Sequence, residues 1–128
     1  MSNIRVYDVI PENECKTLIS LFDLAEKHHD FINNNAKPCF TQLNVNRHYP
    51  KVVESLIPYA RKAYGMYSAD VKNKYLPKLR CLEEFRIKRY NPGGEERFDE
   101  HVDVTRYESA KRALAFLFYL NDNDGDTR

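Results

Sequence analysis

The pattern of the chain changes at LEEFRIKRYNPGGEERFDEHVDV, which spans residues 82–104. Its first nine residues alternate, with Phe85 and Ile87 on one face and Lys88 and Tyr90 on the other, as in a strand that buries one side. The NPGG that follows breaks this strand and predicts a turn, after which FDEHVDV resumes an extended pattern. We therefore expect strands from this point onward.

Helical patterns precede this region. Pro11 suits the first position of a helix, and apolar residues follow it at the spacing of one buried face, which predicts a helix from about Pro11 to His28. A looser, asparagine-rich segment comes next. A second apolar stripe then runs over residues 52–67, and Pro58 within it predicts a kink or a division into two helices, because proline lacks the amide that an interior turn requires.

The last apolar run is ALAFLFYLN, residues 113–121, which has the length of a strand and is followed by the turn signal NDNDGD. The predicted order is thus helices over about residues 1–80 and strands over about residues 81–128. This order indicates an α+β protein whose helices pack on one face of an antiparallel sheet or roll. A length of 128 residues favours a single domain.

Composition excludes some classes of protein. Twenty Lys and Arg residues against nineteen Asp and Glu leave a net charge of +1, so the charge does not indicate a nucleic-acid or anionic-membrane partner. The three cysteines are widely spaced, which argues against a disulfide framework and for a reducing compartment. No apolar stretch is long enough to cross a bilayer. We expect a cytoplasmic protein, and the sequence does not indicate its oligomeric state.

His101 and Asp103 are the candidates for chemistry. On a strand, residues two apart point to the same face with their roots about 7 Å apart, so an imidazole and a carboxylate can bind one metal ion. Two histidines, one carboxylate and open positions suit Fe(II) in non-haem oxygenases. The alternative is a surface ion pair. The same pattern at His28 and Asp30 falls at a predicted helix end, where residues two apart are rotated by about 200° and diverge.

The order and spacing of several short motifs resemble the prolyl 4-hydroxylase family of Fe(II)/2-oxoglutarate dioxygenases. These motifs are Tyr90 with the NPGG turn, the histidine-aspartate pair, the FYLN run and the closing GDT, and together they cover residues 82–128. The resemblance implies a double-stranded β-helix (jelly roll) supported by helices. It also implies hydroxylation of a peptidyl proline, with conversion of 2-oxoglutarate and dioxygen to succinate and CO2, and binding of ascorbate. A peptide or protein would be the substrate.

The resemblance assigns roles to five positions. His101 and Asp103 match the first two iron ligands of the family. Tyr90 matches a tyrosine that contacts 2-oxoglutarate near the metal, and Tyr119 matches the tyrosine that hydrogen-bonds its distal carboxylate. Arg112 matches an arginine near the substrate mouth. The alternative is that both tyrosines are packed core aromatics and that the arginine is a solvated strand end.

The chain departs from the family pattern after Asp103. A third ligand histidine, followed by a lysine or arginine for the distal carboxylate, is absent up to Arg128, and Asp126 stands where a glutamate is usual. We expect residues beyond Arg128 to supply both groups, and the 128 residues alone to be inactive. None of the three upstream histidines is expected to replace the missing ligand.

Two other functions remain open from the sequence. The chain could be a non-catalytic jelly-roll fragment or binding module in which His101 and Asp103 are structural. It could also belong to a related oxygenase that acts on a small molecule or a nucleic-acid base, although a near-neutral charge disfavours nucleic acid as a partner.

Overall fold

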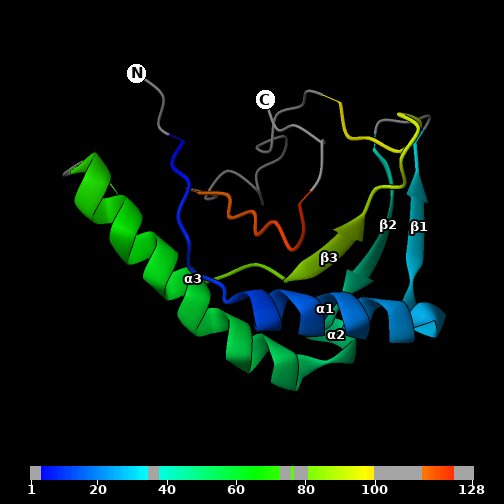
Figure 1. Ribbon diagram of the computed structural model, residues 1–128, viewed down its shortest axis with the longest axis horizontal. Helices are drawn as coiled ribbons and strands as arrows, with labels where there is room; N and C mark the ends of the chain where they lie inside the picture. Colours follow the sequence, from blue (N-terminus) through cyan, green and yellow to red (C-terminus); the bar gives the residue numbers. More distant parts are fainter. Residues whose placement is uncertain (1–3, 35–37, 73–75, 77–80, 100–113, 123–128) are drawn as a thin grey trace.

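The structure is a computed structural model that describes residues 4–34, 38–72, 76, 81–99 and 114–122. Within these residues the chain forms three α-helices, one 3-10 helix and a three-stranded antiparallel sheet (Figure 1). The α+β prediction is therefore confirmed. The sheet is small and open, and the described residues do not form a jelly roll.

The first predicted helix is present in two parts. Helix α1 spans Glu12–Leu24, and the 3-10 helix η1 spans Glu26–His28 after a break at Ala25. The predicted apolar face is the buried face, since Cys15, Leu18, Phe22 and Ala25 are all buried. Periodic spacing of apolar residues thus located this helix correctly.

A β-hairpin follows where the sequence suggested only a loose segment. Strand β1 (Asp30–Asn33) pairs antiparallel with strand β2 (Cys39–Asn44), with Asp30 opposite Gln42. The prediction that helices come first and strands only after residue 80 is therefore wrong. The asparagine-rich segment contains the hairpin connection, and the amide of Asn34 donates to the carbonyl of Pro38 at 2.9 Å.

Two helices come after the hairpin. Helix α2 (Val45–His48) is capped by Asn44, whose side chain accepts a hydrogen bond from the amide of Arg47 at 3.0 Å. Helix α3 then runs without interruption over Pro50–Val71. A division into two helices at Pro58 is not observed. Pro58 and Glu54 are both on the exposed side of α3. A proline in the interior of a helix leaves one carbonyl without its amide partner, which costs least where the helix faces water.

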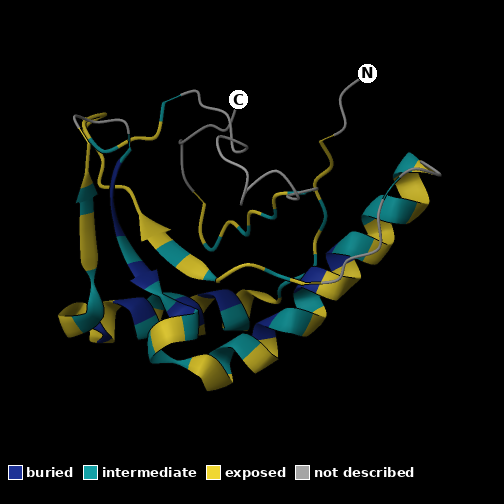
Figure 2. Cartoon of the chain, turned by 180° about the vertical axis from the view of Figure 1, so that it is seen from behind, coloured by how far each residue is buried: buried dark blue, intermediate teal, exposed yellow. Residues whose placement is uncertain are grey.

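The third strand completes the sheet. Strand β3 (Arg86–Arg89) pairs antiparallel with β2, which makes β2 the central strand. Both faces of β2 are largely buried (Figure 2), because Leu43 packs against α1 and Phe40 packs against the rings of Tyr90 and Phe98. Leu43 of β2 lies opposite Ile87 of β3, and both pack against Phe22 and Ala25 at the C-terminal end of α1. The core therefore lies between α1 and one face of the sheet, as the alternation around residue 87 predicted.

The apolar run near the end of the described chain is not a strand. Residues 114–120 alternate between half-buried and exposed positions, as in an extended chain, but they have no regular secondary structure. A strand requires a hydrogen-bonded neighbour, and the described residues do not provide one for this run. The prediction of a buried strand here is therefore wrong for residues 114–120, with Leu117 among the exposed residues.

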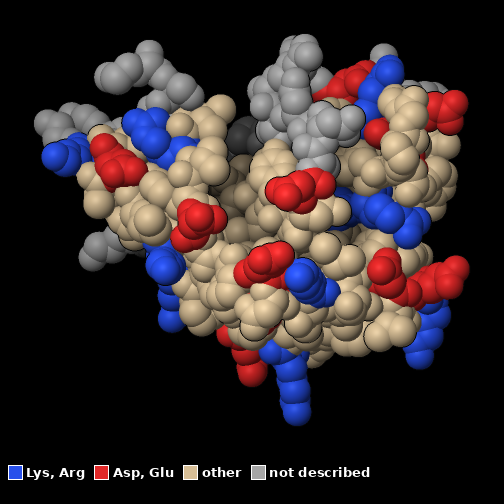
Figure 3. All heavy atoms as spheres, in the orientation of Figure 1, with Lys and Arg blue, Asp and Glu red and all other residues tan. Residues whose placement is uncertain are grey.

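The thiols are free, and the surface charges are mixed in sign. Cys15 and Cys39 are buried, Cys81 is exposed, and all three are free thiols. Acidic and basic side chains are interspersed over the face shown in Figure 3. Among the described helices, none combines the length and the apolarity that crossing a bilayer requires.

Candidate functional site

The structure describes two of the five predicted site residues. His101, Asp103 and Arg112 lie outside the described residues, so their predicted roles are not tested. Tyr90 and Tyr119 lie within the described residues.

Tyr90 directly follows β3 and packs in an aromatic cluster made of Phe40, Tyr90 and Phe98. Its ring centroid lies 5.3 Å from that of Phe40, with the planes inclined by 51°, and the Phe98 ring stacks 6.0 Å from Phe40. Phe40 is 3% exposed and Tyr90 is 42% exposed. One member of the cluster is therefore a core residue, and the tyrosine lies at its margin.

Lys88 contributes a positive charge to this cluster. It lies two residues before Tyr90, on the same face of β3, as the alternating sequence predicted. Its Nζ atom lies 4.6 Å from the ring centroid of Phe40 and 5.6 Å from that of Phe98, within the range of cation–π attraction. Partial burial raises the pKa of Tyr90, so its hydroxyl stays protonated and able to donate at neutral pH.

The turn after Tyr90 forms as predicted. Gly93 and Gly94 have φ angles of 116° and 81°, which residues with a Cβ rarely adopt. Nothing described lies within 4 Å of a Cβ built on either glycine, so backbone conformation, rather than a close approach to another group, explains both residues.

The loop then returns to the sheet. The amide of Asn91 donates to Oε2 of Glu96 at 3.0 Å, and the amide of Cys39 donates to the carbonyl of Arg97 at 2.7 Å. The chain is thus anchored to the start of β2 shortly before the segment that contains His101 and Asp103. Phe40 was not identified as a site residue, because the strand that carries it was not recognised in the sequence. Lys88 was placed on the same face as Tyr90 but was assigned no role, because its contact with Phe40 depends on that unrecognised strand.

Tyr119 is more exposed than Tyr90. It is 56% exposed and belongs to the extended residues 114–120. The structure does not bring Tyr119 into the described aromatic cluster, and its predicted hydrogen bond to a cosubstrate is not tested. The alternative in which Tyr119 is a packed core aromatic is not supported either, because more than half of its surface is accessible.

The three upstream histidines have other contacts. The ring of His29 stacks on Phe22 with centroids 4.1 Å apart, and its Nε2 lies 2.7 Å from the carbonyl oxygen of Phe22. The rings of His28 and His48 stack on each other at 4.0 Å. His28 ends η1 and Asp30 begins β1, so this second histidine-aspartate pattern lies at a helix end. No group of three metal-ligating side chains occurs among the described residues.

A half-open groove of about 260 Å³ lies elsewhere, between α3 and the segment before β3. The residues that line it include Val53, Ile57, Arg61, Cys81 and Phe85. The amide of Phe85 donates to Oδ1 of Asn46 at 2.7 Å, which ties this segment to α2. None of the predicted site residues is among the residues that line this groove.

Comparison with known proteins does not assign the chain to a family: no protein-family model, no curated protein and no solved structure matches it. The function is therefore argued from the residues themselves.

Proposed function

We propose that this chain provides part of the active site of an Fe(II)/2-oxoglutarate-dependent dioxygenase that resembles prolyl 4-hydroxylases and hydroxylates a peptidyl proline. His101 and Asp103 would bind the iron, Tyr90 and Tyr119 would bind 2-oxoglutarate, and Arg112 would lie near the peptide. The described sheet would then be one part of a double-stranded β-helix. Ascorbate would serve such an enzyme as a reductant.

The observation that carries the proposal is the position of Tyr90. The phenol of Tyr90 directly follows β3 and packs beside the buried ring of Phe40, and a turn with two positive-φ glycines comes next. The chain returns to the sheet through Arg97, four residues before His101. This order of a tyrosine, a glycine turn and a histidine-aspartate pair is the one on which the resemblance rests.

The chemistry of the side chains is compatible with the proposed ligands. An imidazole and a carboxylate two residues apart on an extended chain suit Fe(II), which with 2-oxoglutarate and dioxygen supplies the oxidising chemistry. The protonated hydroxyl of Tyr90 can donate to a carboxylate, and the charge of Lys88 on the same face favours an anionic cosubstrate. The residues of this chain would thus hold and orient the cosubstrate.

The proposal is tested by succinate formation in the native protein that contains these residues. With Fe(II), ascorbate and a proline-containing peptide library, His101→Ala and Asp103→Ala should each reduce 2-oxoglutarate turnover to background. Asp30→Asn is a matched control, because it alters the other histidine-aspartate pattern at an exposed position of β1 and should leave turnover unchanged.

Metal binding gives an independent measurement. Mn(II) titration followed by electron paramagnetic resonance should detect a site that is lost in His101→Ala and retained in Asp30→Asn. A native protein that forms no succinate, and in which both variants bind Mn(II) like the wild type, would instead support a non-catalytic β-sheet module.

A further inference from the structure

Two histidines from different elements are stacked at the base of the β1–β2 hairpin. The rings of His28 and His48 lie 4.0 Å apart with an interplanar angle of 17°, and the edge of Tyr49 meets His28 at 6.0 Å and 77°. We call the stacked pair His28–His48 the histidine clasp. We propose that the clasp is an acid-sensitive switch, which holds the hairpin base when the imidazoles are neutral and releases it when both become protonated.

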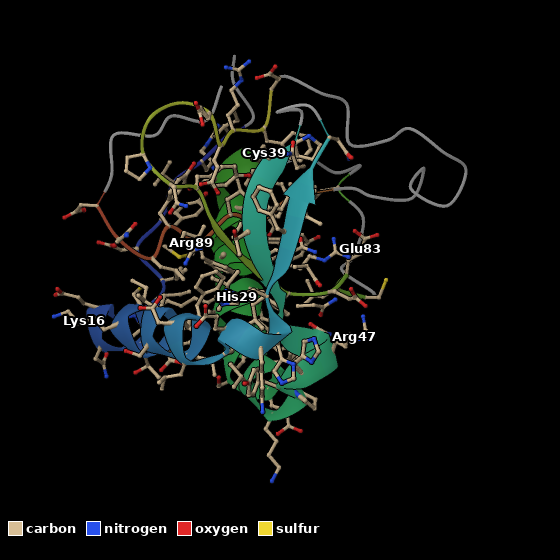
Figure 4. The ribbon with its side chains drawn as sticks, turned by 90° about the vertical axis from the view of Figure 1, so that its right-hand side faces the viewer. Lys16, His29, Cys39, Arg47, Glu83 and Arg89 are labelled. Carbon is tan, nitrogen blue, oxygen red and sulfur yellow. The ribbon has the colours of Figure 1, made fainter. Side chains whose placement is uncertain are left out.

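The position of the clasp determines what it controls. His28 ends η1 two residues before β1 begins, and His48 ends α2, which follows β2 directly. The clasp therefore joins the two chain segments that leave the same end of the hairpin, where Asp30 lies opposite Gln42. Figure 4 shows His29 and Arg47, their sequence neighbours, at this lower end, with Cys39 at the upper end of β2.

Strand β1 depends on this junction. In the described sheet β1 is an edge strand that pairs only with β2, and its four residues are largely exposed. Few buried contacts therefore hold β1 in place apart from its ladder with β2 and its attachment to η1. Loss of the clasp should loosen β1 before it affects the core around Leu43.

The electrostatic setting makes the clasp sensitive to acid. Partial burial, followed by the charges of His48 and Lys27, lowers the pKa of His28 below its ordinary value of 6.5. Neither imidazole forms a hydrogen bond or ion pair with a carboxylate in the described part of the chain, so nothing there compensates a second positive charge. The charged groups of these elements that are nearest in sequence to the clasp are Glu26 and Lys27 of η1, Asp30 of β1, Arg47 of α2 and Lys51 of α3, and Glu54 lies one turn further along α3.

The direction of the pH effect follows from the lowered pKa. The folded state binds a proton at His28 less readily than the unfolded chain, so the unfolded chain carries more protons between the two pKa values. The stabilisation is complete above about pH 6.5, the ordinary histidine value, and is lost as the pH falls through the folded-state pKa. Acid below neutral pH should therefore open the hairpin base.

The test compares the purified wild-type chain with His48→Phe at constant ionic strength. Phenylalanine can stack on His28 but cannot acquire a charge. Between pH 7.5 and pH 5.5 the thermal midpoint of the wild type should fall by roughly 2 to 5 °C more than that of His48→Phe. His29→Gln is the matched control, because His29 stacks on Phe22 rather than on a histidine, and this variant should keep the acid-induced fall.

Two local measurements distinguish a switch from a general loss of packing. In His48→Phe the pKa of His28, measured by NMR, should rise, because the charge of residue 48 no longer opposes protonation. The protection factors of the amides in Asp30–Asn33, corrected for the intrinsic pH dependence of exchange, should fall from pH 7.5 to pH 5.5 in the wild type but not in the variant. Equal acid sensitivity of both proteins, or an unchanged His28 titration, would overturn the proposal. If His48→Phe does not fold, His48→Tyr, whose ring can also stack without acquiring a positive charge, applies the same criteria to the titration of His28.

Discussion

The ring of Tyr90 packs against the buried ring of Phe40, with centroids 5.3 Å apart and planes inclined by 51°. This contact spans two strands, because Phe40 belongs to the central strand β2 and Tyr90 follows the edge strand β3. The contact with Phe40 supports one side of the Tyr90 ring, while 42% of the residue stays exposed. The contact joins the core of the sheet to the residue on which the proposed function depends most.

Removal of the hydroxyl groups of Tyr90 and Tyr119 should weaken binding of 2-oxoglutarate in the native protein. When a buried anion loses one hydrogen-bond donor, its binding weakens by about 1 to 3 kcal/mol. About 1.4 kcal/mol corresponds to a factor of ten in affinity. Tyr119→Phe should therefore raise the 2-oxoglutarate concentration for half-maximal turnover roughly tenfold. Tyr90→Phe should have a larger effect, because the proposed role of Tyr90 is closer to the metal.

The measurement is a cosubstrate titration of succinate formation, with Tyr59→Phe on α3 as the matched control. All three variants keep their rings, so their thermal midpoints should stay near that of the wild type. Identical titrations for Tyr90→Phe and Tyr119→Phe would show that both tyrosines act only in packing.

Leu43→Ala should destabilise the fold strongly. Leu43 is 0% exposed at the centre of the core, and truncation of such a residue leaves a cavity that costs about 2 to 5 kcal/mol. Leu24→Ala at the end of α1 is the matched control, because Leu24 is 86% exposed and its truncation should cost less than about 0.5 kcal/mol. Urea denaturation followed by circular dichroism measures both. Similar losses for the two variants would contradict the placement of the core.

Pro58→Ala should stabilise α3. An interior proline is about 3 kcal/mol less favourable than alanine in a helix, and the added flexibility of the unfolded chain offsets about 0.4 to 1 kcal/mol of that gain. We expect a net increase of about 2 to 2.6 kcal/mol in the free energy of unfolding. Pro50→Ala is the control, because Pro50 begins α3 where no amide is required, and it should give no increase. Destabilisation by Pro58→Ala would indicate that the proline ring itself is required.

Tyr7 should titrate unusually late. Partial burial, together with a 2.6 Å hydrogen bond from its hydroxyl to Oδ2 of Asp70, raises the pKa of Tyr7 to about 12. Because the folded state favours the neutral phenol, the associated stabilisation is complete below the ordinary pKa of 10.0 and is lost as the pH rises through about 12.

Ultraviolet difference titration measures this pKa, with Tyr7→Phe identifying the signal. Asp70→Asn should move the titration of Tyr7 toward 10, since it removes the negative charge while leaving an amide that can still accept a hydrogen bond. A titration that does not respond to Asp70→Asn would mean that Asp70 does not raise the pKa of Tyr7.

Local patterns located several features correctly. The spacing of Cys15, Leu18 and Phe22 located α1 and its buried face, and alternation placed Ile87 toward the core with Lys88 and Tyr90 on the other side. The turn at NPGG also followed from residue type, because two consecutive positive-φ positions favour glycine. A helix face, a strand face and a tight turn depend mainly on residues close together in the chain, so they can be predicted from the sequence.

The hairpin β1–β2 was not visible in the sequence. CFTQLN has no clean alternation because both faces of β2 are largely covered. The partners that cover it are Phe22, Ile87 and the aromatic residues of the loop after β3, which are distant in sequence. A segment preceded by asparagine and proline therefore resembled a loop, although pairing on both sides makes it the centre of the sheet.

The sequence by itself determined the α+β class, the first helix with its buried face, the turn after Tyr90 and the histidine-aspartate pattern on which the proposed function rests. Only the tertiary structure decided that β2 is central, that Phe40 packs against Tyr90 and lies beneath Lys88, and that His28 stacks on His48. It also decided that Pro58 lies within one helix and that residues 114–120 are extended but not paired. The physical reason is that local patterns specify backbone preference and the face to be buried, whereas strand pairing and ring stacking are contacts between residues far apart in the chain.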